Sequence, residues 1–312
     1  LMTGPELLKW LTKFWSKSHN MKHKLHLHRI IQYSVLILFT ASCDLINPAE
    51  QIPTKIKLAK FDLQTQPEQG SDQNKITDIW VYAGSSFLGV FAPPVQIPFL
   101  AEQEQTHFIF HPGIRNNGIA NDAIIYPLYT SYEVTLPTLP GTLVEVNPVT
   151  HYKPNVVVSL NADFETGNEF VDNIDSIPGT FVARSPNDPF EGDYSGEIVL
   201  TATSNYIVVG NALAITGLPT DGRDTYLEFQ YKSEMDFSIG LLGISLDGLR
   251  SYKFFYLVKP TENWNMLYIE LTDLLKVSDF PAYEIVFRSV YPSDATKAEL
   301  KIRLDNIKVV HI

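Results

Sequence analysis

The sequence predicts an all-β fold, in which a cleaved signal segment is followed by an N-terminal Ig-like β-sandwich and then a C-terminal β-jelly-roll sandwich. Aromatic and β-branched residues are plentiful, whereas charged residues make up only 19% of the 312 positions. Apolar and polar residues alternate in short segments such as 227–231 and 300–304, and Gly, Pro and Asn separate these segments. After the signal segment, only residues 271–277 indicate a helical turn.

The charge and the cysteine count narrow the class of protein. The formal net charge is −11, and no basic stretch follows Cys43. Because nucleic-acid binding needs clustered Lys and Arg, nucleic acid is not expected as a partner. A single cysteine excludes an internal disulfide, and in an exported protein a lone thiol needs another explanation.

An export signal is expected at residues 21–42. A basic stretch from Met21 precedes an apolar run of about 13 residues, which is short of the roughly 20 that span a bilayer. We therefore favour a signal peptide over a transmembrane helix. Residues 1–20 are expected to be an upstream extension, with a genuine amphipathic helix as the alternative.

The end of this signal resembles the lipobox of bacterial lipoproteins. Residues 39–43 read Phe-Thr-Ala-Ser-Cys, although Thr40 stands where that family usually has Leu. The resemblance implies that Cys43 is lipidated and anchors the chain to a membrane of the cell envelope, because several acyl chains give stable anchoring. The outer membrane is favoured over the inner one, and ordinary secretion with a stray cysteine is the alternative. Residues 43–53 then hold the lipidated Cys and a polar tether.

Residues 54–152 are predicted to form the Ig-like sandwich, since short strands and turn signals alternate through them. The expected strands are 55–63, 76–82, 87–91, 96–100, 106–110, 123–129, 132–136 and 142–149. The order of Gly84, Gly89, Pro93 or Pro94, and His107 resembles a PEGA-type repeat. That resemblance implies a scaffold or interaction module.

The same region holds a cluster rich in Asn and Tyr between residues 116 and 132. Tyrosine offers a flat apolar ring with a hydroxyl, so such a cluster can bind polar ligands. Turn chemistry combined with strand aromatics is the interpretation that we favour.

Residues 155–312 are predicted to form the jelly roll, because ten strands in this length suit two facing sheets. The expected strands are 156–160, 180–183, 196–202, 206–212, 226–232, 238–245, 252–258, 266–271, 283–289 and 300–312. Alternation in 227–231 and 300–304 predicts one buried and one solvent-exposed face for these strands.

The second half resembles the galactose-binding-like jelly rolls of carbohydrate-binding modules. The matching segments are 161–167 (NADFETG), 192–198 (GDYSGEI), 263–264 (NW) and 302–309 (IRLDNIKV). The resemblance implies a structural calcium held by Glu165 and Asp305, with Asp163 as a neighbour, since calcium prefers hard oxygen ligands. The alternative is that Asp305 caps a turn or accepts backbone N–H groups without metal.

Glycan binding needs exposed aromatic rings and a few polar groups. The candidate ligand-binding residues are Tyr194, Tyr206, Tyr252 and Tyr291. No nucleophile motif, phosphate-binding glycine loop or dense His/Cys cluster appears, so the chain is not expected to be an enzyme. The leading hypothesis is a non-catalytic envelope lipoprotein that binds a glycan or another surface component. The alternatives are a structural or assembly subunit of an envelope complex and, less favoured, a glycan hydrolase.

Overall fold

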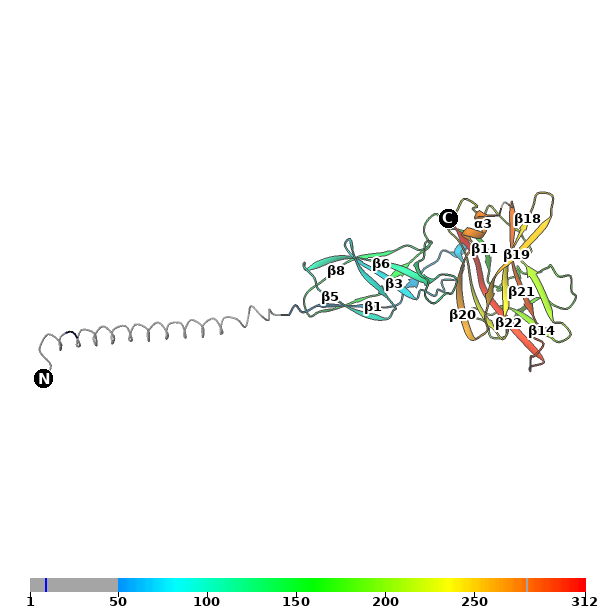
Figure 1. The fold of residues 1–312 in the computed structure, drawn as a ribbon, viewed down its shortest axis with the longest axis horizontal. Coiled ribbons are helices and arrows are strands. Elements are labelled where there is room, and N and C mark those ends of the chain that lie inside the picture. Colours follow the sequence, from blue (N-terminus) through cyan, green and yellow to red (C-terminus); the bar gives the residue numbers. More distant parts are fainter. Residues whose placement is uncertain (1–8, 10–49, 279) are drawn as a thin grey trace. The chain divides into compact units, whose positions relative to one another are not determined.

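A computed structural model describes Lys9, residues 50–278 and residues 280–312 (Figure 1). The predicted signal peptide and Cys43 lie outside the described residues, as do the extension (apart from Lys9) and residues 43–49 of the tether. Within the described part of the chain, no helix has the length and apolar character needed to cross a membrane.

The first sandwich begins at residue 54, and two sheets enclose its core. The strands are β1 (Thr54–Leu58), β2 (Asp62–Leu63), β3 (Asp78–Ala83), β4 (Ser86–Phe91), β5 (Val95–Phe99), β6 (Gln105–Arg115), β7 (Ala123–Ile125), β8 (Tyr132–Pro137), β9 (Leu143–Val146) and β10 (Val149–Thr150), and the short helix η1 (Pro67–Gln69) follows β2. One sheet has the order β5-β1-β9. The other has the order β4-β3-β6-β7, with β8 on β6, and β10 pairs with β2. Alternating residues such as Ile79 and Val81 fill the core.

The second sandwich is a jelly roll of two facing sheets. Its elements are β11 (Val157–Ala162), β12 (Asp172–Asn173), β13 (Val182–Ser185), β14 (Ser195–Thr201), β15 (Tyr206–Gly210), β16 (Ile215–Thr216), β17 (Thr225–Ser233), β18 (Phe237–Ile244), β19 (Arg250–Val258), β20 (Thr261–Glu270), α3 (Thr272–Lys276), β21 (Ala282–Val290) and β22 (Glu299–His311). Sheet 1 has the order β13-β14-β22-β17-β20, with β11 on β22. Sheet 2 has the order β12-β15-β21-β18-β19, with β16 on β21. The protein is thus all-β, as the alternation predicts.

Strand β17, in the interior of sheet 1, is buried on both of its faces. Leu227 and Phe229 point into the jelly-roll core as expected. The prediction that the opposite face of β17 is exposed to solvent is wrong, because Glu228 and Gln230 are 0% and 1% exposed. The first sandwich covers this face, and Tyr126 packs its ring 5.0 Å from the ring of Tyr226.

The two sandwiches therefore share a core. The apolar cluster of the first sandwich continues onto sheet 1 through Tyr226, Met266, Tyr268 and Val310. A backbone hydrogen bond also connects the two sandwiches: the N–H of Asn117 donates to the carbonyl of Tyr268 at 2.9 Å. Among the described residues, no sheet mixes strands from the two halves, yet Pro53–Ile312 forms one compact unit. The domain boundary near residue 154 stays a prediction.

Candidate functional site

The outer face of sheet 2 carries aromatic side chains that the jelly-roll core does not use. Ile207 and Val209 of β15 point into the core, which leaves Tyr206 on the opposite face. In β19, a bulge at residue 255 lets Tyr256 pack toward the core, while Tyr252 and Phe254 lie on the outer side. We call the set Tyr206, Tyr252, Phe254 and Arg288 the aromatic face.

The aromatic face rests on a small apolar floor. Val208, Leu242 and Val286 are buried beneath it and form a cluster separate from the main core. Strand register places Leu242 beside Tyr252, and Val208 beside Arg288. Because neighbouring strands lie about 4.8 Å apart, these side chains form one continuous surface across four strands.

The rings hold defined positions on this surface. The ring centroids of Tyr252 and Phe254 lie 5.4 Å apart in an edge-to-face arrangement. The guanidinium of Arg288 lies 4.0 Å above the ring of Phe254 and reaches Ser238 Oγ at 3.5 Å. Burial raises the pKa of Tyr206, the guanidinium of Arg288 lowers it, and Tyr252 and Asp175 raise it. Tyr252 is 52% exposed, so its ring is open to a ligand.

A charged cluster borders the aromatic face. Arg250 donates to Glu284 Oε2 at 2.6 Å and forms a second, very short ion pair with Asp172. Burial, helped by the nearby Asp172, raises the pKa of Glu284 to about 7 against the lowering effect of Arg250. This cluster offers both donors and acceptors at the edge of the face.

Two predicted ligand-binding residues lie elsewhere. Arg184 covers the ring of Tyr194, with its guanidinium 3.5 Å from the ring centre. Tyr291 packs against the jelly-roll core, and its hydroxyl donates to the carbonyl of Lys297. The structure therefore brings Tyr206 and Tyr252 together and leaves Tyr194 and Tyr291 outside the aromatic face.

The predicted calcium residues bind the loop between β13 and β14. Glu165 Oε1 accepts the backbone N–H groups of Asp193 and Tyr194 at 3.1 and 2.9 Å. Asp305 Oδ2 likewise accepts from Phe190 and Glu191, at 3.1 and 3.3 Å.

The other atoms of these carboxylates are also engaged. Glu165 Oε2 accepts from Asp193 at 3.2 Å, Asp305 Oδ1 accepts from Asn306 at 2.8 Å, and Asp163 Oδ1 accepts from the N–H of Glu165 at 3.0 Å. Burial raises the pKa of Asp305 to about 7; the N–H groups lower it and Glu165 raises it.

Asp305 accepts backbone N–H groups, which is the contact expected of it in the alternative to calcium. The described residues contain no group of three or more His, Cys, Asp or Glu side chains that could hold a metal ion. N–H groups already reach all four oxygens of Glu165 and Asp305, and calcium at Glu165, Asp305 and Asp163 stays a prediction.

Sequence reasoning missed Phe254, Arg288 and the Arg250 cluster. Residues 252 and 254 are two apart in a strand and so share a face, which was a usable signal. Arg288 and Glu284 lie on β21 and Asp172 lies on β12, and only the strand order and register of sheet 2 bring them close to β19.

No protein-family model matches the chain, and no curated protein matches its sequence. Among solved structures, the chain is similar to the xylan-binding CBM22-1 domain of Paenibacillus barcinonensis Xyn10C, at 13% identity and a TM-score of 0.35, covering 50% of this chain and 95% of that one. It is also similar to a carbohydrate-binding module of the β-sandwich superfamily, at 13% identity and a TM-score of 0.33, covering 76% of this chain and 87% of that one. A family 16 carbohydrate-binding module is similar at 16% identity and a TM-score of 0.33, covering 49% of this chain and 99% of that one. These values are too low to transfer a ligand or a role to this chain.

Proposed function

We propose that the chain is a non-catalytic, glycan-binding lipoprotein of the bacterial envelope that binds carbohydrate on its aromatic face. The observation that carries this proposal is the half-exposed ring of Tyr252, which lies on one sheet face with Phe254 and Tyr206. A pyranose ring has an apolar face that stacks on such rings, and its hydroxyls need nearby polar groups. Arg288 and the Arg250–Glu284 pair supply these groups.

The absence of catalysis is part of this proposal. A glycoside hydrolase places its two carboxyl groups at least about 5 Å apart, on either side of the scissile bond. Among the carboxylates beside the aromatic face, Asp172 and Glu284 both bind the same guanidinium nitrogen of Arg250, while Asp175 accepts the backbone N–H of Val208. Such close carboxylates leave no room between them for a sugar linkage.

Membrane attachment rests on the sequence around Cys43. The small residues before it and the polar tether after it support lipidation at this position. Metabolic labelling with a radioactive fatty acid tests this part. We expect Cys43→Ser to lose the label and to leave the membrane fraction, and a membrane-bound Cys43→Ser variant would contradict lipid anchoring.

A glycan array followed by calorimetry on positive glycans tests the binding site. We expect Tyr252→Ala to weaken binding and Phe87→Ala to leave it unchanged. Phe87 is a matched control because it is 51% exposed, against 52% for Tyr252, and lies on the first sandwich. Equal binding by both variants would contradict the aromatic face, and binding to no glycan would contradict the function.

A second candidate function is a subunit of an envelope complex that binds proteins only. It is supported by an exposed aromatic patch on the outer face of the β4-β3-β6 sheet. The rings of Trp80 and Tyr82 lie 5.7 and 5.1 Å from the ring of Phe87, and His111 lies 5.5 Å from Tyr82. This patch agrees with the interaction role that a PEGA-like module would have. Cross-linking in whole cells tests it, with Phe87→Ala as the disrupting variant and Tyr252→Ala as the control.

A further inference from the structure

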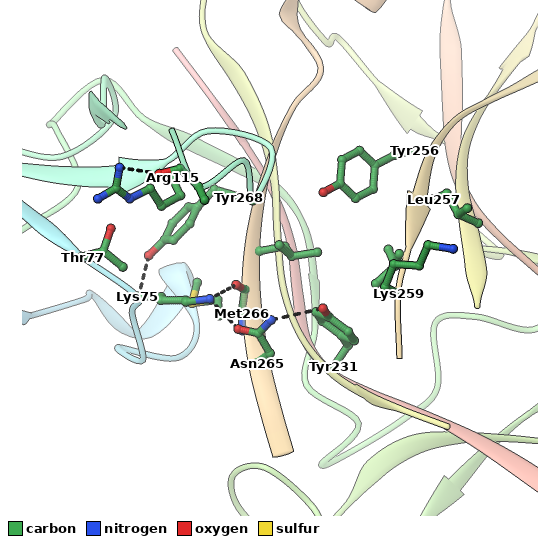
Figure 2. A pocket seen from close by; sticks show the side chains of 14 residues that line it. Lys75, Thr77, Arg115, Tyr231, Tyr256, Leu257, Lys259, Asn265, Met266 and Tyr268 are labelled. Carbon is green, nitrogen blue, oxygen red and sulfur yellow. Dashed lines mark hydrogen bonds between the residues drawn. The ribbon is translucent and has the colours of Figure 1, made fainter. Parts of the chain in front are cut away.

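A second site lies where the two sandwiches meet. A pocket of about 580 Å³ opens between the segment before β3 and strands β19 and β20. Figure 2 shows Lys75 and Thr77 on one side of this pocket, with Tyr256 and Lys259 on the other side. Its volume falls within the range of about 300–1,000 Å³ that is usual for small-molecule sites.

The lining of this junction pocket is positively charged. It includes Lys75, Arg115 and Lys259 but no Asp or Glu, although the whole chain has a net charge of −11. Arg115 is neutralised by the buried Asp78 at 2.8 Å, and Lys259 pairs with Asp236 at 2.7 Å. These two cations already have carboxylate partners.

Lys75 differs from the other two cations. In the part of the chain that the structure describes, no ion pair includes Lys75. Its ammonium donates only to neutral oxygens, namely Asn265 Oδ1 and the carbonyl of Met266. Burial lowers the pKa of Lys75, so the charged form lacks compensation here. An anion in the pocket would provide it.

The rest of the lining suits a hydroxylated ligand. The Asn265 amide and the Tyr231 hydroxyl are bonded to each other at 3.1 Å beside Lys75. The Tyr256 hydroxyl donates to the carbonyl of Asn117, which leaves its oxygen free to accept. Leu257 is 51% exposed and adds an apolar surface.

We propose that the junction pocket binds an acidic sugar, with the carboxylate of a uronic-acid residue on the Lys75 ammonium. Asn265 and Tyr256 would bind its hydroxyls, and Leu257 would pack against its ring. This site is separate from the aromatic face, so it goes beyond the proposed function and does not require it.

Titration of the purified full chain with oligogalacturonate and oligoglucuronate, with neutral oligogalactose for comparison, tests this inference. We expect at least one uronate to bind more tightly than the neutral sugar, and binding to weaken as salt increases. Lys75→Met should lower the affinity by about 10- to 150-fold, because the loss of one charge-assisted bond corresponds to about 1.5–3 kcal/mol. Lys75→Arg should retain part of the binding.

The matched control is Lys55→Met, which removes the same charge from an exposed position on β1. Equal affinity of Lys75→Met and Lys55→Met for uronates would overturn the proposal, as would no uronate binding or equal binding of the neutral sugar. The proposal would also be overturned if a carboxylate-bearing peptide bound in a Lys75-dependent manner while no uronate did.

The two binding proposals fail separately. Uronate binding that depends on Tyr252 and not on Lys75 would overturn the proposal for the junction pocket and would leave the proposal for the aromatic face intact. Uronate binding that depends on Lys75, without Tyr252-dependent binding of any glycan, would overturn the aromatic face alone.

Discussion

Glu228 and Lys308 face each other across β17 and β22 on the buried outer side of sheet 1, with Lys308 Nζ 3.7 Å from Glu228 Oε2. Their side chains are 0% and 1% exposed. Tyr126 and Tyr152 of the first sandwich donate to the two oxygens of Glu228 at 2.5 and 2.7 Å. Lys308 also donates to Tyr152 and to the carbonyl of Ser71, at 2.9 and 3.0 Å. This ion pair therefore joins the jelly roll to the first sandwich.

Removing one member of this pair should destabilise the protein strongly. Glu228→Gln leaves the Lys308 ammonium buried without its counter-ion, and Lys308→Met does the same to Glu228. Each should lower the free energy of unfolding by about 3–5 kcal/mol. Denaturant unfolding measures this loss.

The double variant Glu228→Gln/Lys308→Met is the informative control. Because the double variant leaves no unpaired charge, its free energy of unfolding should decrease by less than the sum of the decreases in the two single variants. Additive losses would mean that the two charges do not depend on each other in the folded state.

The loop between β13 and β14 should tolerate no side chain at Gly192. This residue has φ +65°, and a Cβ there would lie 2.4 Å from Glu165 Oε1. Gly248 has φ +82° with open space around it, so Gly248→Ala should show only the backbone cost, about 1–2 kcal/mol. We expect Gly192→Ala to lose more stability than Gly248→Ala in the same unfolding experiment. Equal losses would mean that the contact with Glu165 relaxes freely.

Calcium removal should have little effect on stability. Backbone N–H groups already satisfy Glu165 and Asp305, so the loop has an anchor that needs no cation. We expect the midpoint of thermal unfolding to be the same in EGTA and in millimolar calcium. An increase with calcium that disappears in Glu165→Gln would establish the metal site that the jelly-roll resemblance implies.

The fold was predictable because alternation is local. Segment 196–202, for example, corresponds closely to β14 (Ser195–Thr201). Segment 55–63 was expected as one strand, but it divides between β1 and β2, which pair with different strands. Segment 123–129 ends as a strand at Ile125, because Tyr126 and the residues after it pack into the junction instead. Such partners are distant in sequence, and no local pattern reveals them.

The junction between the sandwiches was the part that could not be predicted. Tyr126 and Tyr129 belong to the cluster assigned to turns and strand aromatics, yet they are 0% and 2% exposed and face the jelly roll. Glu228 alternates with apolar neighbours as a solvent-facing residue would. Only the docking of a second domain turns such a face into a buried one, and the sequence of one strand does not contain that information.

The contribution of Glu284 to stability should fall as the pH rises from about 4.5 to 7. Burial raises the pKa of Glu284 from 4.5 to about 7, so between these values the folded state binds a proton that the unfolded state has lost. The stabilisation that protonated Glu284 provides is complete below pH 4.5 and is lost as the pH rises through 7. Its size is on the order of 1–3 kcal/mol.

The variant Glu284→Gln tests this assignment, because it keeps the shape and cannot titrate. Its unfolding free energy should change less than that of the parent between pH 4.5 and 7. Asp305 titrates in the same direction with a pKa of about 7, so part of the dependence should remain. An unchanged pH profile would exclude Glu284 as a source.

The ring of Tyr252, rather than its hydroxyl, should carry glycan affinity on the aromatic face. Its edge-to-face contact with Phe254 fixes the ring, and its exposed face is the part that a pyranose can cover. In calorimetry with a glycan that the parent binds, Tyr252→Phe should stay within about threefold of the parent, while Tyr252→Ala should lose about five- to tenfold, equivalent to about 1 kcal/mol of ring contact. A large loss in Tyr252→Phe would instead assign recognition to the hydroxyl, and the aromatic face would then bind through hydrogen bonds instead of stacking.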